Sequence, residues 1–315
     1  MDVLRVGTRA SALARTQSGQ VAARLQQALG RPTELVDVTT AGDVSRASLA
    51  SLGGTGVFVS ALREALLRGE VDVAVHSLKD LPTAPADGVV LAAVPLREDP
   101  RDVVVARDGL TLGELPAGAR IGTGSPRRVS QIRALGLGLE LVDVRGNVDT
   151  RIGKVRAGEL DAVVLARAGL ARLGRVGDAT EVLDPLQVLP APGQGALAVE
   201  CRADDPLAEA VREALDDART RAAVTAERTV LAVLEAGCAA PVGALAEVVE
   251  GEQGEELWLR AVALSTDGAV TVRRSASGPF DGNAAAEALG RTLAGEMLAD
   301  GAADLIDNRQ IASSK

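Results

Sequence analysis

Short runs of β-branched residues alternate along the chain with longer segments whose apolar side chains recur at helical spacing. Near the N-terminus this pattern predicts strands at residues 4–7, 33–38 and 71–75 and helices at residues 12–29 and 57–68. Ser11 is a suitable N-cap for the first helix, and Gly30 follows its last turn as a stop signal. Alternation of this kind is typical of βαβ units and largely parallel sheets.

A polar, glycine-rich segment at residues 39–56 interrupts this alternation. It contains Gly42, Gly53, Gly54 and Gly56. Segments of this length are uncommon between the elements of a compact domain and often serve as lids. We therefore expect a lid over a binding site here.

Two short motifs occur twice, which predicts two similar α/β lobes facing each other across a cleft. Residues 6–11 (VGTRAS) resemble residues 121–126 (IGTGSP), and each leads from a strand through a turn to a helix. Residues 68–72 (RGEVD) resemble residues 157–161 (AGELD), and each ends a helix and enters a hydrophobic strand.

Beyond the motif LPAPGQG at residues 189–195 the pattern changes. A strand is predicted at residues 196–201, a helical run from residue 207 to a stop at Gly237, strands at 257–264 and 270–273 around a Thr-Asp-Gly hairpin signal, and a final helix at 283–298. This order favours a third, smaller α+β domain.

Composition and charge narrow the classes of partner. Hydrophobic residues make up 47% of the 315 and charged residues 24%, as in soluble globular proteins. The net charge of −9 argues against a globally basic nucleic-acid-binding surface. One Trp, two Phe and no Tyr are too few for a base-stacking platform. Lysine occurs only at positions 79, 154 and 315, so almost all positive charge is carried by arginine.

We expect a cytoplasmic protein that binds no metal. The N-terminal region has no apolar h-region of a signal peptide, and no apolar run is long enough to span a membrane. Two cysteines, Cys201 and Cys238, do not make a disulfide framework. A single histidine cannot build a histidine-rich metal site.

The strongest local feature is VHSLKDLP at residues 75–82, at the expected end of a buried strand. Open parallel sheets place ligands at that end. Neighbouring Lys79 and Asp80 are by themselves typical of a solvated surface pair. At a strand end in a closed cleft, however, Asp80 could act as a general acid or stabilise a developing cation. We expect His76 to be a hydrogen-bonded structural residue rather than a catalytic one.

Arginines gather at predicted helix starts and strand ends. They are Arg9 in the first lobe and Arg127, Arg128, Arg145, Arg151 and Arg172 in the second. Ser125 and Pro126 are typical of an N-cap and a first helical residue, so a positive helix end is expected there. Guanidinium groups bind carboxylates through paired hydrogen bonds, so this cluster suits a ligand with several carboxylates, although phosphates would fit equally well.

The two cysteines lie in different settings. Cys238 follows Gly237 in a turn of small residues, which leaves a thiol accessible, whereas Cys201 lies in a predicted strand and is expected in the core. No histidine is close to Cys238 in sequence, so a Cys–His nucleophile is weakly supported. Covalent attachment of another group to Cys238 stays open.

Seven ordered motifs resemble the hydroxymethylbilane synthase, or porphobilinogen deaminase, family of the tetrapyrrole pathway. They are VGTR at 6–9, GGTGVFV at 53–59, VHSLKDLP at 75–82, GTGSPRR at 122–128, RGNVDTR at 145–151, PGQGA at 192–196 and GCAAPVG at 237–243. Each motif is weak alone, and the ordered set is specific. The similarity runs from Arg5 to about Gly243 and is less distinct beyond.

The resemblance implies an α/β fold with two type II periplasmic-binding-protein-like lobes of mainly parallel sheets and a smaller α+β C-terminal domain. Lobe 1 would comprise residues 1–97 and 196–217, with Asp80 and the lid at 39–56. Lobe 2 would comprise residues 98–195, and the C-terminal domain, with Cys238, residues 218–315. The family suggests a monomer.

The resemblance also implies a dipyrromethane cofactor joined to Cys238 by a thioether and a catalytic carboxylate at Asp80. The family condenses four porphobilinogen molecules head to tail, expels ammonia each time and hydrolyses the chain to release hydroxymethylbilane. By the same resemblance, Lys79, Ser125, Arg127 and Arg128 would hold cofactor carboxylates, and Arg9, Ser11, Gln17, Arg145, Arg151 and Arg172 would hold substrate or chain carboxylates.

The sequence departs from the family pattern at three places. Thr55 and Ser60 stand where the family commonly has lysines, and Ala12 follows Ser11 where the family usually has Pro. The missing lysine at Thr55 puts in doubt how the expected lid engages the growing chain. It leaves the assignments of Cys238 and Asp80 untouched.

Two alternatives of other classes are kept. A cytosolic two-lobed binding or sensor protein for a polycarboxylate would explain the lobes and the arginines but not Cys238. A phosphate-handling transferase would use the helix N-termini, and nucleotide-dependent turnover would favour it. The glycines at residues 53–56 are not a Walker motif, because no Gly-Lys-Ser/Thr follows them.

Overall fold

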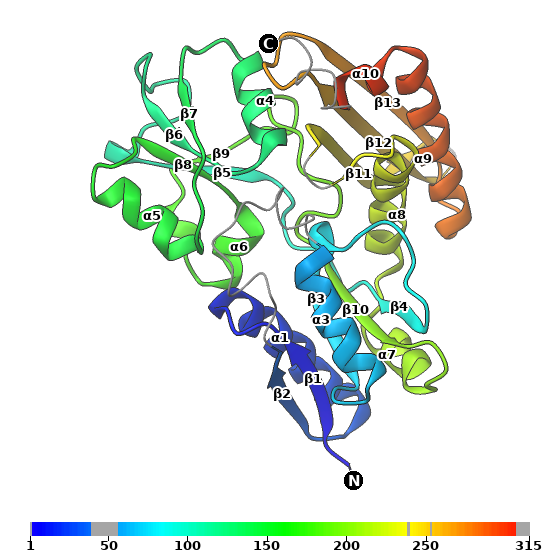
Figure 1. The fold of residues 1–315 in the computed structure, drawn as a ribbon. Coiled ribbons are helices and arrows are strands. Elements are labelled where there is room, and N and C mark those ends of the chain that lie inside the picture. Colours follow the sequence, from blue (N-terminus) through cyan, green and yellow to red (C-terminus); the bar gives the residue numbers. More distant parts are fainter. Residues whose placement is uncertain (1, 39–55, 238–239, 253, 307–315) are drawn as a thin grey trace. The chain divides into compact units, whose positions relative to one another are not determined.

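The computed structural model describes residues 2–38, 56–237, 240–252 and 254–306 (Figure 1). Two compact units make up the chain: unit 1 is Met1–Glu98 with Gly195–Arg221, and unit 2 is Asp99–Gln194 with Ala222–Lys315. Almost all of the predicted lid, including Thr55, and also Cys238, lie outside the described residues.

Unit 1 is built on a five-stranded sheet with the order β2-β1-β3-β10-β4, here called the first sheet. Its strands are β1 (Leu4–Thr8), β2 (Thr33–Asp37), β3 (Val73–Ser77), β4 (Val89–Ala93) and β10 (Leu197–Arg202). Four strands run in one direction, and β10 runs against them. Helices α1 (Ala12–Leu29) and α7 (Leu207–Leu215) cover one face, and α3 (Gly56–Leu67) covers the other (Figure 1).

Helix α1 has the predicted bounds, and both of its end signals are confirmed. The Ser11 side chain accepts a hydrogen bond from the Ala14 N–H, 3.3 Å away. Gly30 ends the helix in the left-handed region at φ 63°, which glycine adopts without steric cost.

Unit 2 contains a second sheet with the order β7-β6-β8-β5-β9. Its strands are β5 (Asp102–Ala106), β6 (Arg120–Gly122), β7 (Glu140–Val142), β8 (Ala162–Ala166) and β9 (Glu181–Val182). Here β5 runs against the other four strands. Helix α4 (Pro126–Ala134) packs on one face, α5 (Val148–Arg156) packs on the other, and α6 (Arg167–Arg172) follows β8.

The two sheets share one plan, which confirms the repeat predicted from sequence. Gly7 of β1 pairs with Ala74 of β3, and Gly122 of β6 pairs with Val163 of β8. In each sheet the strand that runs against the others is the fourth in the order, β10 in the first sheet and β5 in the second. Equivalent residues can therefore be compared between the sheets.

The third sheet, also in unit 2, is antiparallel with the order β11-β12-β13. Its strands are β11 (Val242–Gly251), β12 (Gly254–Leu264) and β13 (Thr271–Pro279). Helices α8 (Ala218–Val233), α9 (Gly282–Ala299) and α10 (Ala302–Ile306) share one apolar core with it. The predicted fold class, two mainly parallel α/β lobes and an α+β C-terminal domain, is confirmed, although β11 was not predicted.

The single helical run predicted from residue 207 to Gly237 is wrong. Helices α7 and α8 are separated at Asp216 and Asp217. The Asp216 carboxylate accepts a hydrogen bond from the Val94 N–H at 2.7 Å, which holds the chain extended there. The Asp217 carboxylate accepts one from the Thr220 N–H at 2.7 Å and so caps the new helix.

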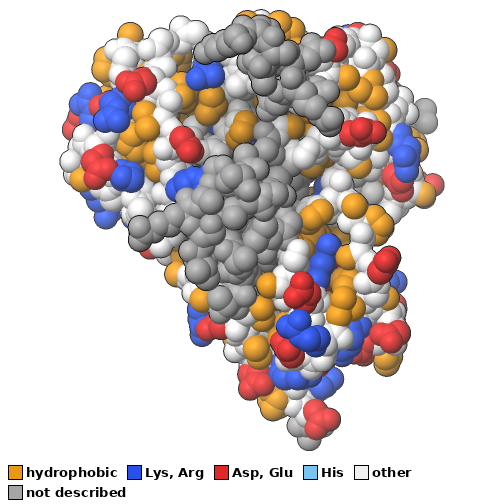
Figure 2. Space-filling model, viewed as in Figure 1, with side chains coloured by type: hydrophobic (Ala, Val, Ile, Leu, Met, Phe, Trp, Pro, Cys, Tyr) orange, Lys and Arg blue, Asp and Glu red, His pale blue; other side chains and the backbone are white. Residues whose placement is uncertain are grey.

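Charged side chains of both signs are interspersed over the face seen in Figure 2. Exposed charged side chains form local ion pairs, such as Arg68 with Glu70 at 2.7 Å and Arg212 with Glu209 at 3.2 Å. Among the helices that the structure describes, none combines the length and apolar character needed to cross a membrane.

Candidate functional site

Lys79 and Asp80 follow strand β3 in a short 3-10 turn, Leu78–Asp80. The turn is anchored by backbone hydrogen bonds from Leu78 N to Ala196 O at 3.0 Å and from Leu81 N to Leu78 O at 3.1 Å. Leu78 and Leu81 are buried, whereas Lys79 and Asp80 are half-exposed. The two leucines thus fix a turn that presents a cation and a carboxylate at the carboxyl end of the strand.

Arg9 and Ser11 lie in the turn after the neighbouring strand β1. Because β1 and β3 are parallel, their carboxyl ends lie at the same edge of the first sheet. Arg9 and Ser11 are half-buried, and the Ser11 hydroxyl caps α1. Gln17 lies further along α1 and is buried. These residues therefore belong to the sheet edge that carries Asp80, or to the helix that begins there.

In the second sheet, the equivalent edge leads from β6 into α4. Ser125 is the N-cap of α4, with its side chain 3.5 Å from the Arg128 N–H, and Pro126 is the first helical residue, as predicted. Arg127 and Arg128 therefore lie in the first turn of the helix, where backbone N–H groups and the helix dipole favour anions.

Both arginine side chains are buried, and both bind one carboxylate. Arg127 donates from Nη2 to Asp102 Oδ2 at 2.8 Å, and Arg128 donates from Nη2 to Asp102 Oδ1 at 2.7 Å. Gln194 Nε2 also donates to Asp102 Oδ1, at 2.8 Å. Burial works to raise the pKa of Asp102, but attraction to Arg127 and Arg128 outweighs it and holds that pKa well below its usual range.

This cluster contains more positive than negative charge. Two guanidinium groups share the one carboxylate of Asp102, and their Nε atoms are buried with no hydrogen-bond partner among the described residues. Burial lowers the pKa of Arg151, and the charges of Arg128 and Arg145 lower it further. The structure thus brings these arginines near one another, in an arrangement that favours binding of an anion.

The remaining predicted arginines lie after β7, in α5, and in α6 after β8. Arg145 is exposed after β7, and Arg151 in α5 donates from Nε to the Gly146 carbonyl at 2.9 Å. Gly146 has φ 107°, and a Cβ there would lie 2.9 Å from Thr150 Cβ, so this close turn requires glycine. Arg172 is the last residue of α6 and is half-buried.

Cys201 is a core residue, as expected. It is completely buried in β10, and burial raises its pKa to about 12, so its thiol stays protonated. Cys238 lies outside the described residues, and the structure therefore gives no account of its thiol.

Sequence reasoning missed Asp102 and Gln194. Asp102 begins a strand whose next three residues are all valine, and a lone carboxylate at the start of such a buried run needs cationic partners. That composition was a usable signal, but the partners lie 25 and 26 residues further along the chain.

Sequence comparison identifies the relatives of the chain. Residues 4–210 match the family described as "Porphobilinogen deaminase, dipyromethane cofactor binding domain", and residues 221–299 match "Porphobilinogen deaminase, C-terminal domain". Porphobilinogen deaminase 1 of Streptomyces coelicolor is 61% identical over 312 residues, which cover 97% of this chain and 98% of the relative. Porphobilinogen deaminase of Mycobacterium avium is 58% identical over 309 residues, 96% of each chain.

Similar solved structures are more distant. The VFT2 domain of Bordetella pertussis BvgS matches with a TM-score of 0.42 and 18% identity, over 67% of this chain and 86% of that one. Immunogenic lipoprotein A of Vibrio vulnificus matches with a TM-score of 0.40 and 11% identity, over 67% of this chain and 94% of that one. Similarity this low says nothing about ligand or activity.

The family resemblance seen in seven sequence motifs is thus confirmed by relatives about 60% identical over nearly the whole chain. Together with the two domain matches, it shows that the chain belongs to the porphobilinogen deaminase family, which consists of transferases with a domain that binds a dipyrromethane cofactor.

Proposed function

We propose that the chain condenses four porphobilinogen molecules head to tail, releases ammonia at each addition and finally releases hydroxymethylbilane by hydrolysis. Membership of the porphobilinogen deaminase family supports this reaction. The proposed attachment of the dipyrromethane is a thioether to Cys238. When bound, this cofactor supplies the fixed primer to which the first substrate is added.

The observation that carries the proposal is the surplus of buried cations around Asp102. Each porphobilinogen has an acetate and a propionate, so every addition increases the negative charge that the protein must hold. Two buried arginines share one carboxylate, and their Nε atoms have no hydrogen-bond partner among the described residues. This arrangement fits a ligand that bears carboxylates. The residues present therefore suit the cofactor and the growing chain.

We assign the carboxylate contacts accordingly. Lys79, Ser125, Arg127 and Arg128 hold the cofactor, and Arg9, Ser11, Gln17, Arg145, Arg151 and Arg172 hold substrate or the growing chain. Their positions at the carboxyl edges of the first and second sheets, or on helices that begin there, support this assignment.

Asp80 is the proposed catalytic carboxylate. Loss of ammonia from porphobilinogen leaves an electron-poor azafulvenium, and a nearby carboxylate lowers the energy of such a cation. Asp80 can also accept hydrogen bonds from pyrrole N–H groups and help to move protons. Its place in a turn anchored by buried Leu78 and Leu81 supports this role, because a fixed carboxylate needs little reorganisation during the reaction.

We further propose three domains, with lobe 1 at residues 1–97 and 196–217, lobe 2 at 98–195 and a C-terminal domain at 218–315. Unit 1 and the separate third sheet are consistent with this division. The protein would act as a cytoplasmic monomer that binds neither nucleic acid nor membrane. The net charge of −9 supports the absence of nucleic-acid binding, and the free thiol of Cys201 suits a reducing compartment such as the cytoplasm.

Intact mass spectrometry of the purified chain tests the proposal. We expect an adduct with the mass of two linked pyrroles, lost in Cys238→Ser and retained in the matched control Cys201→Ser. The chain should release ammonia from porphobilinogen. An active chain without an adduct, or an adduct that persists in Cys238→Ser, would disprove the proposed attachment.

A further inference from the structure

Unit 1 contains a buried charged cluster that the proposed reaction does not use directly. Glu200 of β10 accepts hydrogen bonds from Arg63 of α3, at 2.7 Å from Nη2 and 3.0 Å from Nε. The Nε2 atom of His76 in β3 lies 3.1 Å from Glu200 Oε2. The exposed fraction of the side chain is only 15% for Arg63, 4% for His76 and 3% for Glu200.

Glu200 is ionised in this cluster. Burial works to raise its pKa, but the contacts with His76 and Arg63 outweigh burial and lower the pKa from 4.5 to about 2. A buried charge has a large desolvation penalty, so its presence in a strand interior needs an explanation.

The second sheet contains the same positions without the charges. Ala74 of β3 and Val163 of β8 are equivalent. Ala74 pairs with Glu200 of β10, and Val163 pairs with Val105 of β5. The residue two places later in each strand lies on the same face of its sheet. The equivalent residues are therefore Val105 for Glu200 and Leu165 for His76.

The turns that follow helices α3 and α5 contain the same hydrogen bond, so the residues of these two helices can also be matched. The carbonyls of Leu66 and Val155 each accept a hydrogen bond from the glycine N–H three residues later. Counting back three residues from each carbonyl makes Ile152 of α5 the equivalent of Arg63.

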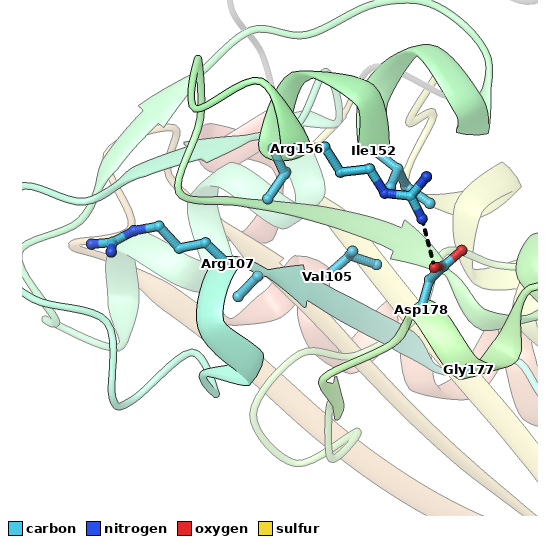
Figure 3. A pocket seen from close by; sticks show the side chains of 8 residues that line it. Val105, Arg107, Ile152, Arg156, Gly177 and Asp178 are labelled. Carbon is cyan, nitrogen blue, oxygen red and sulfur yellow. Dashed lines mark hydrogen bonds and ion pairs between the residues drawn. The ribbon is translucent and has the colours of Figure 1, made fainter.

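All three equivalents are apolar and belong to one buried cluster. Leu165, Val105 and Ile152 are at most 5% exposed and share a hydrophobic core. Val105 and Ile152 line a cavity of about 380 Å³. Figure 3 shows their side chains together with the ion pair of Arg156 and Asp178, which also line it. Replacement of a buried ion pair by well-packed apolar residues is often neutral or stabilising, so apolar side chains can take the place of these charges in this fold, as they do in the second sheet.

The charged cluster and the turn that carries Asp80 occur in the same sheet. The backbone bond from Leu78 N to Ala196 O recurs in the second sheet from Arg167 N to Arg101 O. That match makes Ala168 and Gly169 the equivalents of Lys79 and Asp80. The sheet without the charged cluster therefore also lacks the carboxylate at the strand end.

The cluster joins the three elements around that turn. His76 is the penultimate residue of β3, and Asp80 follows four residues later. Glu200 lies on β10, which follows directly after the Ala196 carbonyl that anchors the turn. Arg63 lies on α3, which begins at Gly56, the last residue of the glycine-rich segment.

We propose that Arg63, Glu200 and His76 are positioning residues that fix the end of β3, and with it Asp80, for the reaction. The inference rests on the proposed function of Asp80. A shift of the carboxylate by about 1 Å is enough to lower a rate by about 100-fold, even when the altered residues do not touch the substrate.

Exchange of the cluster for its counterparts in the second sheet tests the proposal. The triple variant Arg63→Ile, His76→Leu, Glu200→Val should unfold at a temperature close to that of the parent and carry the full cofactor mass. Its kcat for porphobilinogen should fall by about 10- to 100-fold with KM little changed, which indicates loss of an interaction that acts in the transition state.

The matched control removes a hydrogen bond from a backbone N–H to a partly buried aspartate, a contact that both sheets share. Asp72 accepts from the Arg5 N–H at 2.9 Å, as Asp161 accepts from the Arg120 N–H at 2.7 Å. Because both sheets contain this contact, it serves the fold. Asp72→Asn should lower the unfolding temperature and leave kcat unchanged.

The outcomes separate the two proposals. If the parent chain does not turn over porphobilinogen, both the proposed function and the positioning role are overturned. If the parent is active and the triple variant is equally active, only the positioning role is overturned. If the triple variant does not fold, Glu200→Gln decides, because it removes the charge and keeps the shape. A parent-like kcat in Glu200→Gln overturns the positioning role, and a tenfold or greater loss at full cofactor occupancy supports it.

Discussion

Arg127 donates from Nη2 to Oδ2 of Asp102 over 2.8 Å, and both side chains are almost completely buried. Arg128 binds the other oxygen of the same carboxylate. Asp102 is therefore the only carboxylate bound to the two buried cations among the described residues. Its removal would leave two desolvated guanidinium groups without a carboxylate partner from the protein.

Asp102→Asn should therefore destabilise unit 2 strongly. Breaking a buried ion pair by removal of one partner costs about 3–5 kcal/mol, because the remaining charge is unpaired. The measurement is the urea midpoint of unfolding. Asp108→Asn is the control, because Asp108 pairs with Arg107 at the surface and should leave the midpoint unchanged. A parent-like midpoint for Asp102→Asn would show that the two arginines do not depend on this carboxylate.

The stability of unit 1 should depend on pH through Glu200. Its pKa is lowered to about 2 in the folded chain, whereas 4.5 is its ordinary value. The unfolded chain therefore binds the proton more readily, and the stabilisation is complete above about pH 4.5 and disappears as the pH falls towards 2. The full effect is about 3 kcal/mol.

Urea midpoints of the parent and of Glu200→Gln, compared between pH 7 and pH 3, measure this contribution. Asp102 and other carboxylates titrate in both proteins, so the difference between the two isolates Glu200. We expect the parent to be more stable at pH 7 and the gap to narrow below pH 4.5. A gap that stays constant with pH would contradict the assignment of the charge to Glu200.

Local signals along the chain were sufficient to predict much of the fold. The caps at Ser11 and Ser125 were recognised because a capping side chain acts within three residues of itself. The repeat was visible because β1 with β6, and the turns before β3 and β8, have the same local requirements. The break between α7 and α8 was missed because Asp216 makes its bond to Val94, 122 residues away.

The ionic contacts of the site could not be predicted for the same reason. Arg127 and Arg128 were expected at a helix start, and they lie there, but their burial on Asp102 depends on strand order. Arg63 and Glu200 are 137 residues apart and meet only because β10 enters the first sheet from beyond the second. Periodicity along the chain contains no information on such pairs.

The two cysteines should differ in reactivity. Cys201 is completely buried with a pKa of about 12, so iodoacetamide should not modify it in the folded chain. After denaturation Cys201 should be alkylated, whereas Cys238 should stay unmodified if it carries the proposed thioether. Peptide mapping after alkylation measures both. Rapid alkylation of Cys201 in the folded chain would contradict its place in the core.

Asp80→Asn should separate catalysis from cofactor attachment. The variant keeps the size of the side chain in a half-exposed turn, so the fold and the cofactor mass should be retained. Loss of one group that stabilises developing charge lowers kcat by about 10²–10³-fold. Steady-state release of ammonia from porphobilinogen, together with intact mass, gives both quantities on one sample.

Asp87→Asn is the matched control, because Asp87 is an exposed carboxylate in the same unit. It should retain parent turnover, so a loss in Asp80→Asn alone cannot come from a general decrease in negative charge. A variant of Asp80 that turns over normally would remove this carboxylate from the chemistry. The Arg63, Glu200 and His76 cluster would then have no catalytic group to position, since Asp80 is the carboxylate in the turn that follows β3.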